Sequence, residues 1–302
     1  MATLEEIKKI GILGAGQMGR GIAQIAATSG FDVVLADTSF ELADRGRSKI
    51  VSTWKQLVDK QKMTPQACSE STARIASADG PEDFRACDFV IEAATENAEV
   101  KLALFRTCDS VLAPGKWLAS NTSSISLTRL AAATCRPDRV IGMHFMNPPP
   151  LMKLVEIVRA LQTSEPTYAA TVELARKMGK TVVTTKDMPG FIVNRMLIPF
   201  INEACFALQE GLGTTEDIDQ AARLGLNHPM GPLQLADLIG LDTCLFIAEV
   251  LQREFGEDKY RPSALLRNYV AAGWLGKKTN RGFYLYSEGS IERPSAHPPA
   301  RP

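Results

Sequence analysis

The segment Lys8–Ala23, KKIGILGAGQMGRGIA, joins a short apolar run to three closely spaced glycines. In a strand–turn–helix unit, Gly14 allows the tight turn, Gly16 lets the backbone approach a pyrophosphate, and Gly19 lets the helix pack closely on the strand. The amide end of that helix then faces the anion. Because glycines also occur in ordinary turns, the spacing alone leaves both interpretations open.

A second apolar run favours the nucleotide-binding interpretation. Asp32–Ala36 predicts a strand, and Asp37 follows it at roughly the 20-residue separation from Gly14 that the dinucleotide fingerprint requires. An acidic side chain there can accept hydrogen bonds from ribose hydroxyls. We therefore predict a dinucleotide site that includes the three glycines, Gln17 and Met18 between them, and Asp37.

The composition excludes several classes of function. The 302 residues are 45% hydrophobic, and 34 lysines and arginines balance 34 aspartates and glutamates, so no global field attracts the chain to nucleic acid or to an anionic membrane. No run approaches membrane-spanning length, and the first strand begins too early for a targeting peptide. The six cysteines show no metal-binding or redox spacing. We expect a cytoplasmic protein without a metal site.

Apolar runs alternate with helical patterns over the first part of the chain. Strands are predicted at 32–36, 88–93, 117–120, 140–143, 154–158 and 181–184, and helices at 40–62, 98–110 and 167–178. This alternation is typical of a Rossmann-type, doubly wound and mostly parallel α/β sheet. We therefore expect a dinucleotide-binding domain over residues 1–186.

The pattern changes near Asp187, after which apolar residues recur at helical spacing. Pro199 is expected to bend the first of these helices without ending it. We therefore expect an all-α domain over residues 187–287. The proline-rich segment 288–302 is expected to be a disordered tail.

Histidine is the side chain best suited to proton transfer near neutral pH, and His144 is the only one of three that follows a predicted strand. Ligands of open α/β sheets bind at such strand ends, where an imidazole can take a hydroxyl proton while hydride leaves the carbon. The alternative is a histidine satisfied within the core. Glu156 lies on the next strand between Val155 and Ile157, where an unpaired carboxylate is costly and needs a partner.

Three further features each have two interpretations. Asn121–Ser124 follow a predicted strand, where they either bind cofactor and substrate or form an Asx or Ser/Thr turn. Asn194 opens the first helix of the second domain and either orients a substrate carbonyl or bonds between the domains. The predicted helix at 40–62 is rich in lysine and arginine, which by itself indicates a solvated helix face.

Together these motifs resemble the 3-hydroxyacyl-CoA dehydrogenase family, in particular its short, monofunctional 3-hydroxybutyryl-CoA dehydrogenases. The resemblance runs nearly end to end. Its most specific segments are Gly14–Ala23, Glu92–Asn97, Asn121–Ser124, His144–Pro148, Met152–Glu156, Asp187–Arg195, Pro229–Pro232 and Gly240–Asp242. The resemblance implies an NAD-dependent (S)-3-hydroxyacyl-CoA dehydrogenase that interconverts 3-hydroxybutyryl-CoA and acetoacetyl-CoA.

The resemblance also implies roles for individual residues. His144 is implied as the catalytic base, Glu156 as its orienting partner, and Ser123 and Asn194 as catalytic residues that position the substrate. The substrate-binding residues are Ser123, Asn147, Asn194, Thr53 and Lys60, the last two on the basic helix facing the phosphate-bearing part of coenzyme A. The NAD contacts beyond the glycine turn are Asp37, Glu96, Lys101 and Asn121. A homodimer formed through the helical domain is also implied.

Other interpretations remain open at the level of the sequence. Asp37 is followed by Thr38 and Ser39 rather than by arginine, which favours NAD over NADP, although Arg45 and Arg47 lie nearby. A β-hydroxyacid or sugar-acid dehydrogenase has a similar architecture but generally relies on a lysine for catalysis. A non-catalytic NAD-binding protein is the alternative from another class.

Overall fold

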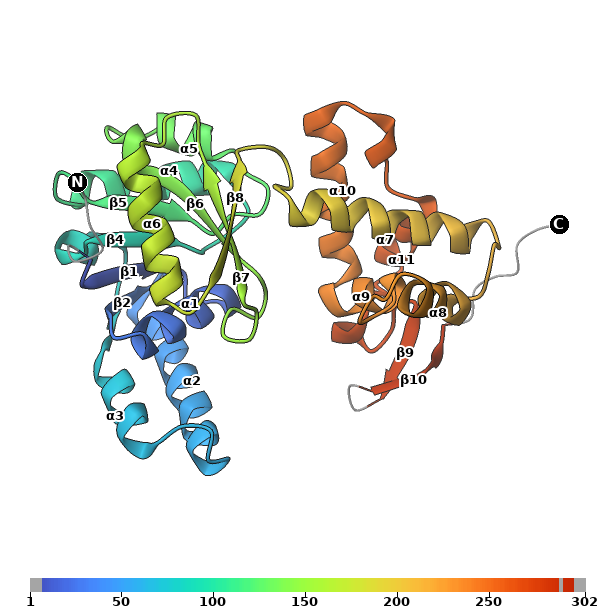
Figure 1. Cartoon of the computed structure of the whole chain (residues 1–302), viewed down its shortest axis with the longest axis horizontal. Helices are drawn as coiled ribbons and strands as arrows, with labels where there is room; N and C mark the ends of the chain where they lie inside the picture. Colours follow the sequence, from blue (N-terminus) through green and yellow to red (C-terminus); the bar gives the residue numbers. More distant parts are fainter. Residues whose placement is uncertain (1–6, 288–289, 296–302) are drawn as a thin grey trace. The chain divides into compact units, whose positions relative to one another are not determined.

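The computed structural model describes residues 7–287 and 290–295. The chain divides into two compact units, Met1–Phe191 (unit 1) and Ile192–Pro302 (unit 2), a few residues beyond the predicted boundary. Unit 1 contains a mostly parallel sheet with helices on both faces, and unit 2 is mainly helical (Figure 1). This confirms the predicted fold class. No helix among the described residues is long and apolar enough to cross a membrane.

The sheet of unit 1 has the strand order β3-β2-β1-β4-β5-β6-β7-β8. All neighbouring strands are parallel except β6 and β7, which pair antiparallel. The strands are β1 (Lys9–Leu13), β2 (Asp32–Ala36), β3 (Ile75–Ala78), β4 (Phe89–Glu92), β5 (Trp117–Ser120), β6 (Val140–Phe145), β7 (Leu154–Arg159) and β8 (Thr181–Lys186). The chain order reverses around β1 and β4, so their carboxyl ends flank a topological switch point where ligands of such sheets bind.

Helices cover both faces of this sheet. The helices of unit 1 are α1 (Gln17–Thr28), α2 (Phe40–Asp59), α3 (Pro65–Ala73), α4 (Ala98–Val111), α5 (Leu127–Ala132) and α6 (Glu165–Lys177), with short 3-10 turns η2 (Pro81–Ala86) and η3 (Pro137–Arg139). Trp54 of α2 packs with Ile12 in one core, which α1 and α6 also cover, whereas Phe105 of α4 packs with Val90 in the other. Adjacent strand residues point to opposite faces, so each strand contributes to both cores.

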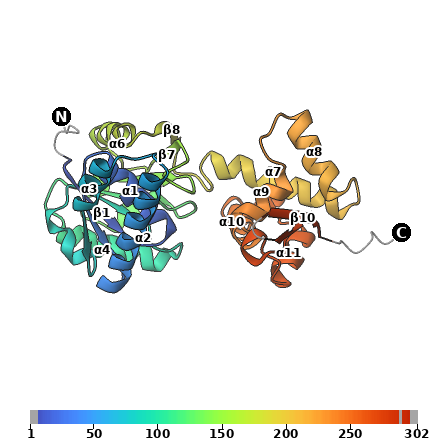
Figure 2. The same ribbon diagram turned by 90° about the horizontal axis from the view of Figure 1, so that it is seen from below.

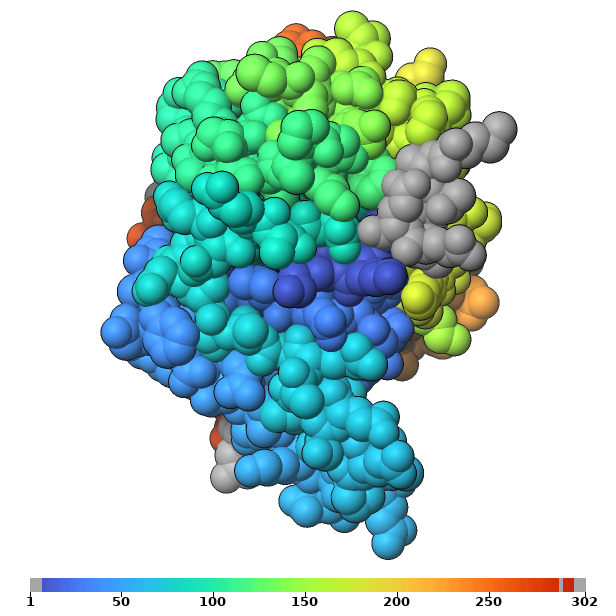
Figure 3. Space-filling model, turned by 90° about the vertical axis from the view of Figure 1, so that its left-hand side faces the viewer, coloured from blue at the N-terminus to red at the C-terminus, as the bar shows by residue number. Residues whose placement is uncertain are grey.

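The α2–α3 segment is the part of unit 1 that the sequence patterns described least well. α3 and β3 were not predicted, and Figure 3 shows this region, in light blue and cyan, projecting from the rest of unit 1. Thr64 caps α3 by accepting a hydrogen bond from the Ala67 N–H, and Pro65 occupies its first turn. The start signals of a helix are therefore present, but its apolar periodicity is weak.

Unit 2 packs its helices around the long helix α7. The helices are α7 (Val193–Gln209), α8 (Thr215–Gly225), α9 (Pro232–Ile239), α10 (Leu241–Phe255) and α11 (Ala264–Ala271), with 3-10 turns η4 (Asp258–Tyr260) and η5 (Lys277–Thr279). α7 runs through Pro199 and packs against α9, α10 and α11 (Figure 2). Leu233, Leu251 and Phe283 are fully buried in the core that results.

The predicted tail from residue 288 is wrong for residues 290–294. Ser290–Pro294 form β10, which pairs antiparallel with β9 (Tyr284–Ser287). The pairing was missed because the proline-rich composition of residues 295–302 was extended to the whole segment, although residues 288–294 contain one proline, Pro294. Residues 288–289 and 296–302 of the predicted tail lie outside the described residues.

Candidate active site

The turn after β1 has the geometry that a dinucleotide pyrophosphate requires. Gly14 has φ 106°, and its N–H donates to the Ala36 carbonyl at the end of β2 (2.8 Å). A Cβ on Gly19 would lie 1.7 Å from the Gly14 carbonyl oxygen, so only glycine lets α1 approach this closely. A Cβ on Gly16 would meet no atom within 4 Å. The backbone is therefore tightly packed at Gly19 and open at Gly16, where a pyrophosphate would approach.

The first turn of α1 is suited to an anion. Gly16 precedes the helix and no side chain caps it, so the first N–H groups of α1 have no side-chain acceptor. Gln17 begins the helix, and Met18 packs its side chain against the core. The backbone N–H of Met18 is therefore the group suited to the predicted cofactor contact.

Asp37 ties the end of β2 to the glycine turn. Its Oδ2 accepts from the Ala15 N–H (2.6 Å), and its Oδ1 accepts from the Thr38 N–H (2.7 Å). Oδ1 also accepts from the Thr38 hydroxyl (3.2 Å), so the second lone pair of Oδ2 is the acceptor position that suits a ribose hydroxyl. Its predicted contact with NAD stays a prediction.

His144 and Glu156 form a buried pair on neighbouring strands. They lie directly opposite each other in the antiparallel register of β6 and β7. His144 Nδ1 is 2.7 Å from Glu156 Oε2, with the carboxylate fully buried and the histidine 7% exposed. The ring of Phe191 meets the imidazole edge-on, with 5.5 Å between ring centroids. The fold thus brings together the two residues that the sequence predicted as a dyad.

This geometry makes His144 a competent general base. A carboxylate accepts only, so Nδ1 carries the proton that it donates to Glu156, and the lone pair resides on Nε2. Nε2 has no hydrogen-bond partner among the described residues. An imidazolium formed by proton uptake at Nε2 is stabilised by the adjacent carboxylate. The pair can therefore accept a proton from a hydroxyl group or return one to a carbonyl oxygen.

The residues after β5 form hydrogen bonds with β6 and with Glu96, which follows β4. Asn121 Oδ1 accepts from the Phe145 N–H, next to His144 (2.9 Å). Glu96 accepts from the Thr122 hydroxyl (2.7 Å) and the Ser123 N–H (2.8 Å). Glu96 also lies 3.3 Å from Ser123 Oγ. Asn121, Ser123 and Glu96 are thus brought together, although their contacts with ligands stay predictions.

Lys101 is buried in unit 1 and forms an ion pair with Glu92. It is 2% exposed, and its ammonium donates to both carboxylate oxygens of Glu92 at 2.7 Å. Glu92 also accepts from Ser120 Oγ (2.7 Å) and the Ala94 N–H (2.8 Å). Lys101 therefore braces the ends of β4 and β5 from inside. Its predicted direct contact with NAD stays a prediction.

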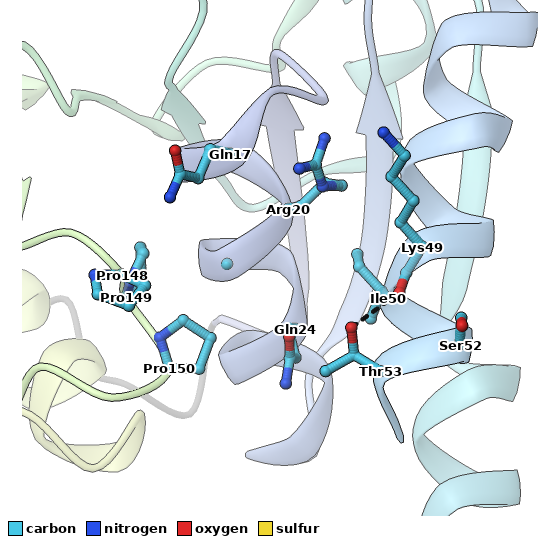
Figure 4. A pocket seen from close by; sticks show the side chains of 11 residues that line it. Gln17, Arg20, Gln24, Lys49, Ile50, Ser52, Thr53, Pro148, Pro149 and Pro150 are labelled. Atoms are coloured by element: carbon cyan, nitrogen blue, oxygen red, sulfur yellow. Dashed lines mark hydrogen bonds between the residues drawn. The ribbon is translucent and has the colours of Figure 1, made fainter. Parts of the chain in front are cut away.

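A hollow of about 400 Å³ lies between α1, α2 and the loop after β6 (Figure 4). Arg20 and Lys49 line it and no carboxylate does, so the hollow favours anions. Thr53 is part of the lining and donates its hydroxyl to the Lys49 carbonyl (3.0 Å). Lys60 is exposed just after α2 and is not part of the lining.

The two remaining candidates are Asn147 and Asn194. Asn147 is exposed on the loop after β6. Asn194 belongs to unit 2, where it lies in the first turn of α7 and is 8% exposed. Their predicted contacts with substrate stay predictions. In the described part of the chain, no three His, Cys, Asp or Glu side chains are grouped so that they can hold a metal ion.

A glycine turn shaped for a dinucleotide, joined to a His–Glu proton-transfer pair at the end of β6, defines the class of dinucleotide-dependent dehydrogenases. The comparisons with known proteins specify the family. The family model for the NAD-binding domain of 3-hydroxyacyl-CoA dehydrogenase matches residues 9–188, and the model for the C-terminal domain of the same enzymes matches residues 190–286. The chain belongs to the NAD-dependent 3-hydroxyacyl-CoA dehydrogenase family.

Individual relatives share most of the chain. The chain is 53% identical to the 3-hydroxybutyryl-CoA dehydrogenase of Bradyrhizobium diazoefficiens over 280 residues, covering 93% of this chain and 96% of that protein. It is 42% identical to the enzyme of the same name from Clostridioides difficile, covering 93% and 100%. The crystal structure of (S)-3-hydroxybutyryl-CoA dehydrogenase from Ralstonia eutropha superposes with a TM-score of 0.90 at 50% identity, covering 93% and 100%.

The sequence did not lead us to two buried charged residues, Glu92 and Lys180, that hold segments next to the candidate site residues. Glu92 follows Ile91 and precedes Ala93, so the argument that singled out Glu156 as a buried acid in need of a partner applied equally to Glu92. Lys180 is also buried, and its partners are two backbone carbonyls. No sequence pattern indicates that second arrangement, because any residue has a carbonyl.

Proposed function

We propose that this chain catalyses the NAD-dependent interconversion of (S)-3-hydroxybutyryl-CoA and acetoacetyl-CoA, with His144 as the general base. The buried contact between His144 and Glu156 in unit 1 carries this proposal. The names of the relatives in Bradyrhizobium diazoefficiens and Ralstonia eutropha support the short acyl chain. Bound NAD supplies the hydride acceptor, and the residues of the chain supply proton transfer and positioning.

The proton step assigns each member of the dyad a task. In the oxidative direction, Nε2 of His144 takes the proton of the substrate 3-hydroxyl as hydride leaves the carbon that bears this hydroxyl. Glu156 keeps the Nδ1 proton in place and stabilises the imidazolium. In the reductive direction, the imidazolium returns the proton to the carbonyl oxygen. Ser123 and Asn194 are proposed to form hydrogen bonds with the substrate oxygens, and Asn147 to contact the substrate from its loop. Glu96 and Asn121 are proposed to contact NAD.

The anion-favouring hollow is proposed to receive the phosphate-bearing part of coenzyme A. Arg20 and Lys49 supply positive charge, and Thr53, whose hydroxyl donates to the Lys49 carbonyl, lines the same hollow (Figure 4). Lys60 lies further along the same basic segment. The positive charge of the lining supports the expectation that the basic helix contacts a ligand as well as solvent.

Assembly and location are proposals as well. Unit 2 exposes several large apolar side chains, including Met196, Leu212 and Leu238, which a second copy of the chain would cover in the proposed homodimer. Sedimentation measures this directly, and a monomer at micromolar concentration contradicts it. Location in the cytoplasm also stays a prediction, which cell fractionation tests.

The test of the proposed activity is NADH consumption by the purified chain. With acetoacetyl-CoA we expect turnover in the ordinary enzyme range of about 1–10³ s⁻¹. Free acetoacetate with NADH serves as the matched probe for a β-hydroxyacid dehydrogenase, because its reduction also consumes NADH. Turnover of the free acid at a rate equal to that of the thioester contradicts the proposal, and no turnover with either substrate indicates a non-catalytic NAD-binding protein.

A further inference from the structure

A buried cation lies behind the loop that connects His144 to Glu156. β6 and β7 form an antiparallel hairpin whose connecting loop is residues 146–153. Lys180 directly precedes β8, and the first residue of β8, Thr181, pairs beside the start of β7. Lys180 is only 8% exposed. The lysine is therefore placed at the closed end of the hairpin that carries the dyad.

The ammonium of Lys180 holds two carbonyls of this loop. Nζ donates to the Pro149 oxygen (2.5 Å) and to the Met152 oxygen (2.8 Å). Three consecutive prolines at 148–150 have no N–H, so the loop is poor in donors of its own. The N–H groups of Leu151 and Met152 both donate to the Pro148 carbonyl. Lys180 thus supplies donors that the loop lacks.

The opposite side of the loop packs directly on α1. A Cβ on Gly21 would lie 2.8 Å from Pro149 Cδ, which shows how closely the proline approaches the helix. The loop is therefore held between the backbone of α1 and the ammonium of Lys180. Pro148, Pro149 and Pro150 form one wall of the anion-favouring hollow, as Figure 4 shows. The position of that wall consequently depends on groups on both sides of the loop.

Filling the buried volume at position 180 does not by itself explain why this residue is a lysine. Burial lowers the pKa of Lys180, because removing the ammonium from water disfavours its charged form. An unbranched apolar side chain would fill the same volume without this cost. What the lysine adds is two directed hydrogen bonds to the loop. Its presence is explained if the loop has to be held in one position.

We propose that Lys180 is a positioning residue for the dehydrogenase reaction. Through the carbonyls of Pro149 and Met152 it fixes the wall against which the coenzyme A part of the substrate lies, and it steadies the hairpin that carries His144. The proposal rests on the proposed function for the identity of the ligand. Lys180 itself contacts neither substrate nor cofactor in this account.

Lys180→Met is the direct test, because it keeps the length of the side chain and removes the donors. We expect KM for acetoacetyl-CoA to rise about tenfold and kcat to fall several-fold, since small displacements of a binding surface are costly. The Kd of NADH should stay within about twofold, because the glycine turn is separate from the loop. Lys186→Met, at an exposed lysine of β8, is the matched control and should leave all three values unchanged.

Hydrogen exchange provides a readout that does not depend on activity. In folded Lys180→Met the amides of Leu151 and Met152 should exchange at least about tenfold faster than in the wild type, because the loop that holds them has lost its anchor. If exchange is faster in Lys180→Met but the wild-type chain has no activity towards acetoacetyl-CoA, the anchoring role stays supported and only the proposed function is refuted.

Three results would overturn the proposal. The first is unchanged exchange together with unchanged KM. The second is an equal loss of NADH and acetoacetyl-CoA binding, which indicates general damage. If Lys180→Met does not fold, Lys180→Gln is measured in the same way, because it removes the charge but keeps amide donors. Failure of both variants to fold is the third result, since it assigns Lys180 to the stability of the whole unit.

Discussion

Buried carboxylates occur in both units, but their surroundings differ. In unit 2, Asp219 accepts from the N–H groups of Leu233 and Gln234 and from the Tyr284 hydroxyl. Asp237 accepts from the N–H groups of Phe283 and Tyr284 and from the Tyr286 hydroxyl. In unit 1, Glu156 instead orients an imidazole whose other nitrogen remains open among the described residues.

The difference separates a structural use of buried charge from a chemical one. Asp219 and Asp237 hold the start of α9 and the strand β9 through donors that do not titrate near neutral pH. Close glycines support this packing, since a Cβ on Gly231 would lie 2.2 Å from Asp219 and one on Gly282 would lie 1.9 Å from Asp237. The Glu156 carboxylate instead lies against Nδ1 of an imidazole, a group that can take up a proton at its other nitrogen. Burial alone therefore does not identify an active site; the partner does.

Glu156→Gln is expected to give the largest effect of the changes that sharpen this comparison. The amide keeps the volume but removes the charge that stabilises the imidazolium and fixes its tautomer. By analogy with other acid–histidine pairs, kcat should fall by at least about a hundredfold, measured by NADH consumption with acetoacetyl-CoA. A kcat within about threefold of the wild type contradicts the assigned role of Glu156.

Asp219→Asn is the matched change in unit 2. Its amide places an N–H group against backbone donors, so we expect the free energy of unfolding to fall by about 3 kcal/mol. The folded protein should retain wild-type kcat, because Asp219 holds backbone N–H groups and a tyrosine hydroxyl rather than the His144 imidazole. Denaturant unfolding and steady-state kinetics on the same sample measure both quantities. A loss of kcat without a loss of stability would contradict the distinction between Asp219 as a structural carboxylate and Glu156 as a catalytic one.

Gly16→Ala tests the open side of the glycine turn. The new Cβ meets no protein atom within 4 Å, so folding stability should change little. It would project towards the expected pyrophosphate, and the Kd of NADH should rise about tenfold. Gly225→Ala in unit 2 also has open space around its Cβ and is the control for both measurements. Equal NADH binding in the two variants would indicate that the cofactor phosphates lie elsewhere.

Asp237 gives the smallest expected effect, on stability against pH. Burial raises its pKa to about 6 in the folded chain, against 3.8 in a model peptide. Between these values the folded chain binds more protons than the unfolded one, so the contribution of Asp237 to stability falls as pH rises. From about pH 5 to about pH 7 the loss is about 1 kcal/mol. Asp237→Asn should lack this component, and identical pH slopes for the two proteins would contradict it.

The sequence predicted much of unit 1 because its signals are local. The glycine turn and the strand ending at Asp37 have characteristic spacing, and His144 and Glu156 were identified as a buried acid and base on neighbouring strands. Their direct contact depends on the antiparallel register of β6 and β7, to which the sequence analysis assigned no direction. The dyad was therefore predictable as a pair, although its geometry was not.

The remaining features depend on side-chain contacts between different elements of the fold. Lys101 pairs with Glu92, and Lys180 holds carbonyls about thirty residues earlier in the chain. Neither arrangement produces a periodicity or a motif. β10 was missed for a related reason, since its strand structure depends on pairing with β9 and the segment has no strand pattern of its own. Composition and spacing identify groups that act locally, whereas supporting contacts require the fold.

The comparison of kcat between the wild type and His144→Gln, with acetoacetyl-CoA and NADH at saturation, tests the central claim most directly. General-base catalysis predicts a fall of about 10²–10⁴-fold with the Kd of NADH within about twofold of the wild type. That result would assign the proton transfer to the imidazole of His144, whose Nδ1 contacts Glu156 and whose Nε2 is open among the described residues. A His144→Gln variant that retains kcat within about threefold would contradict the account of the active site.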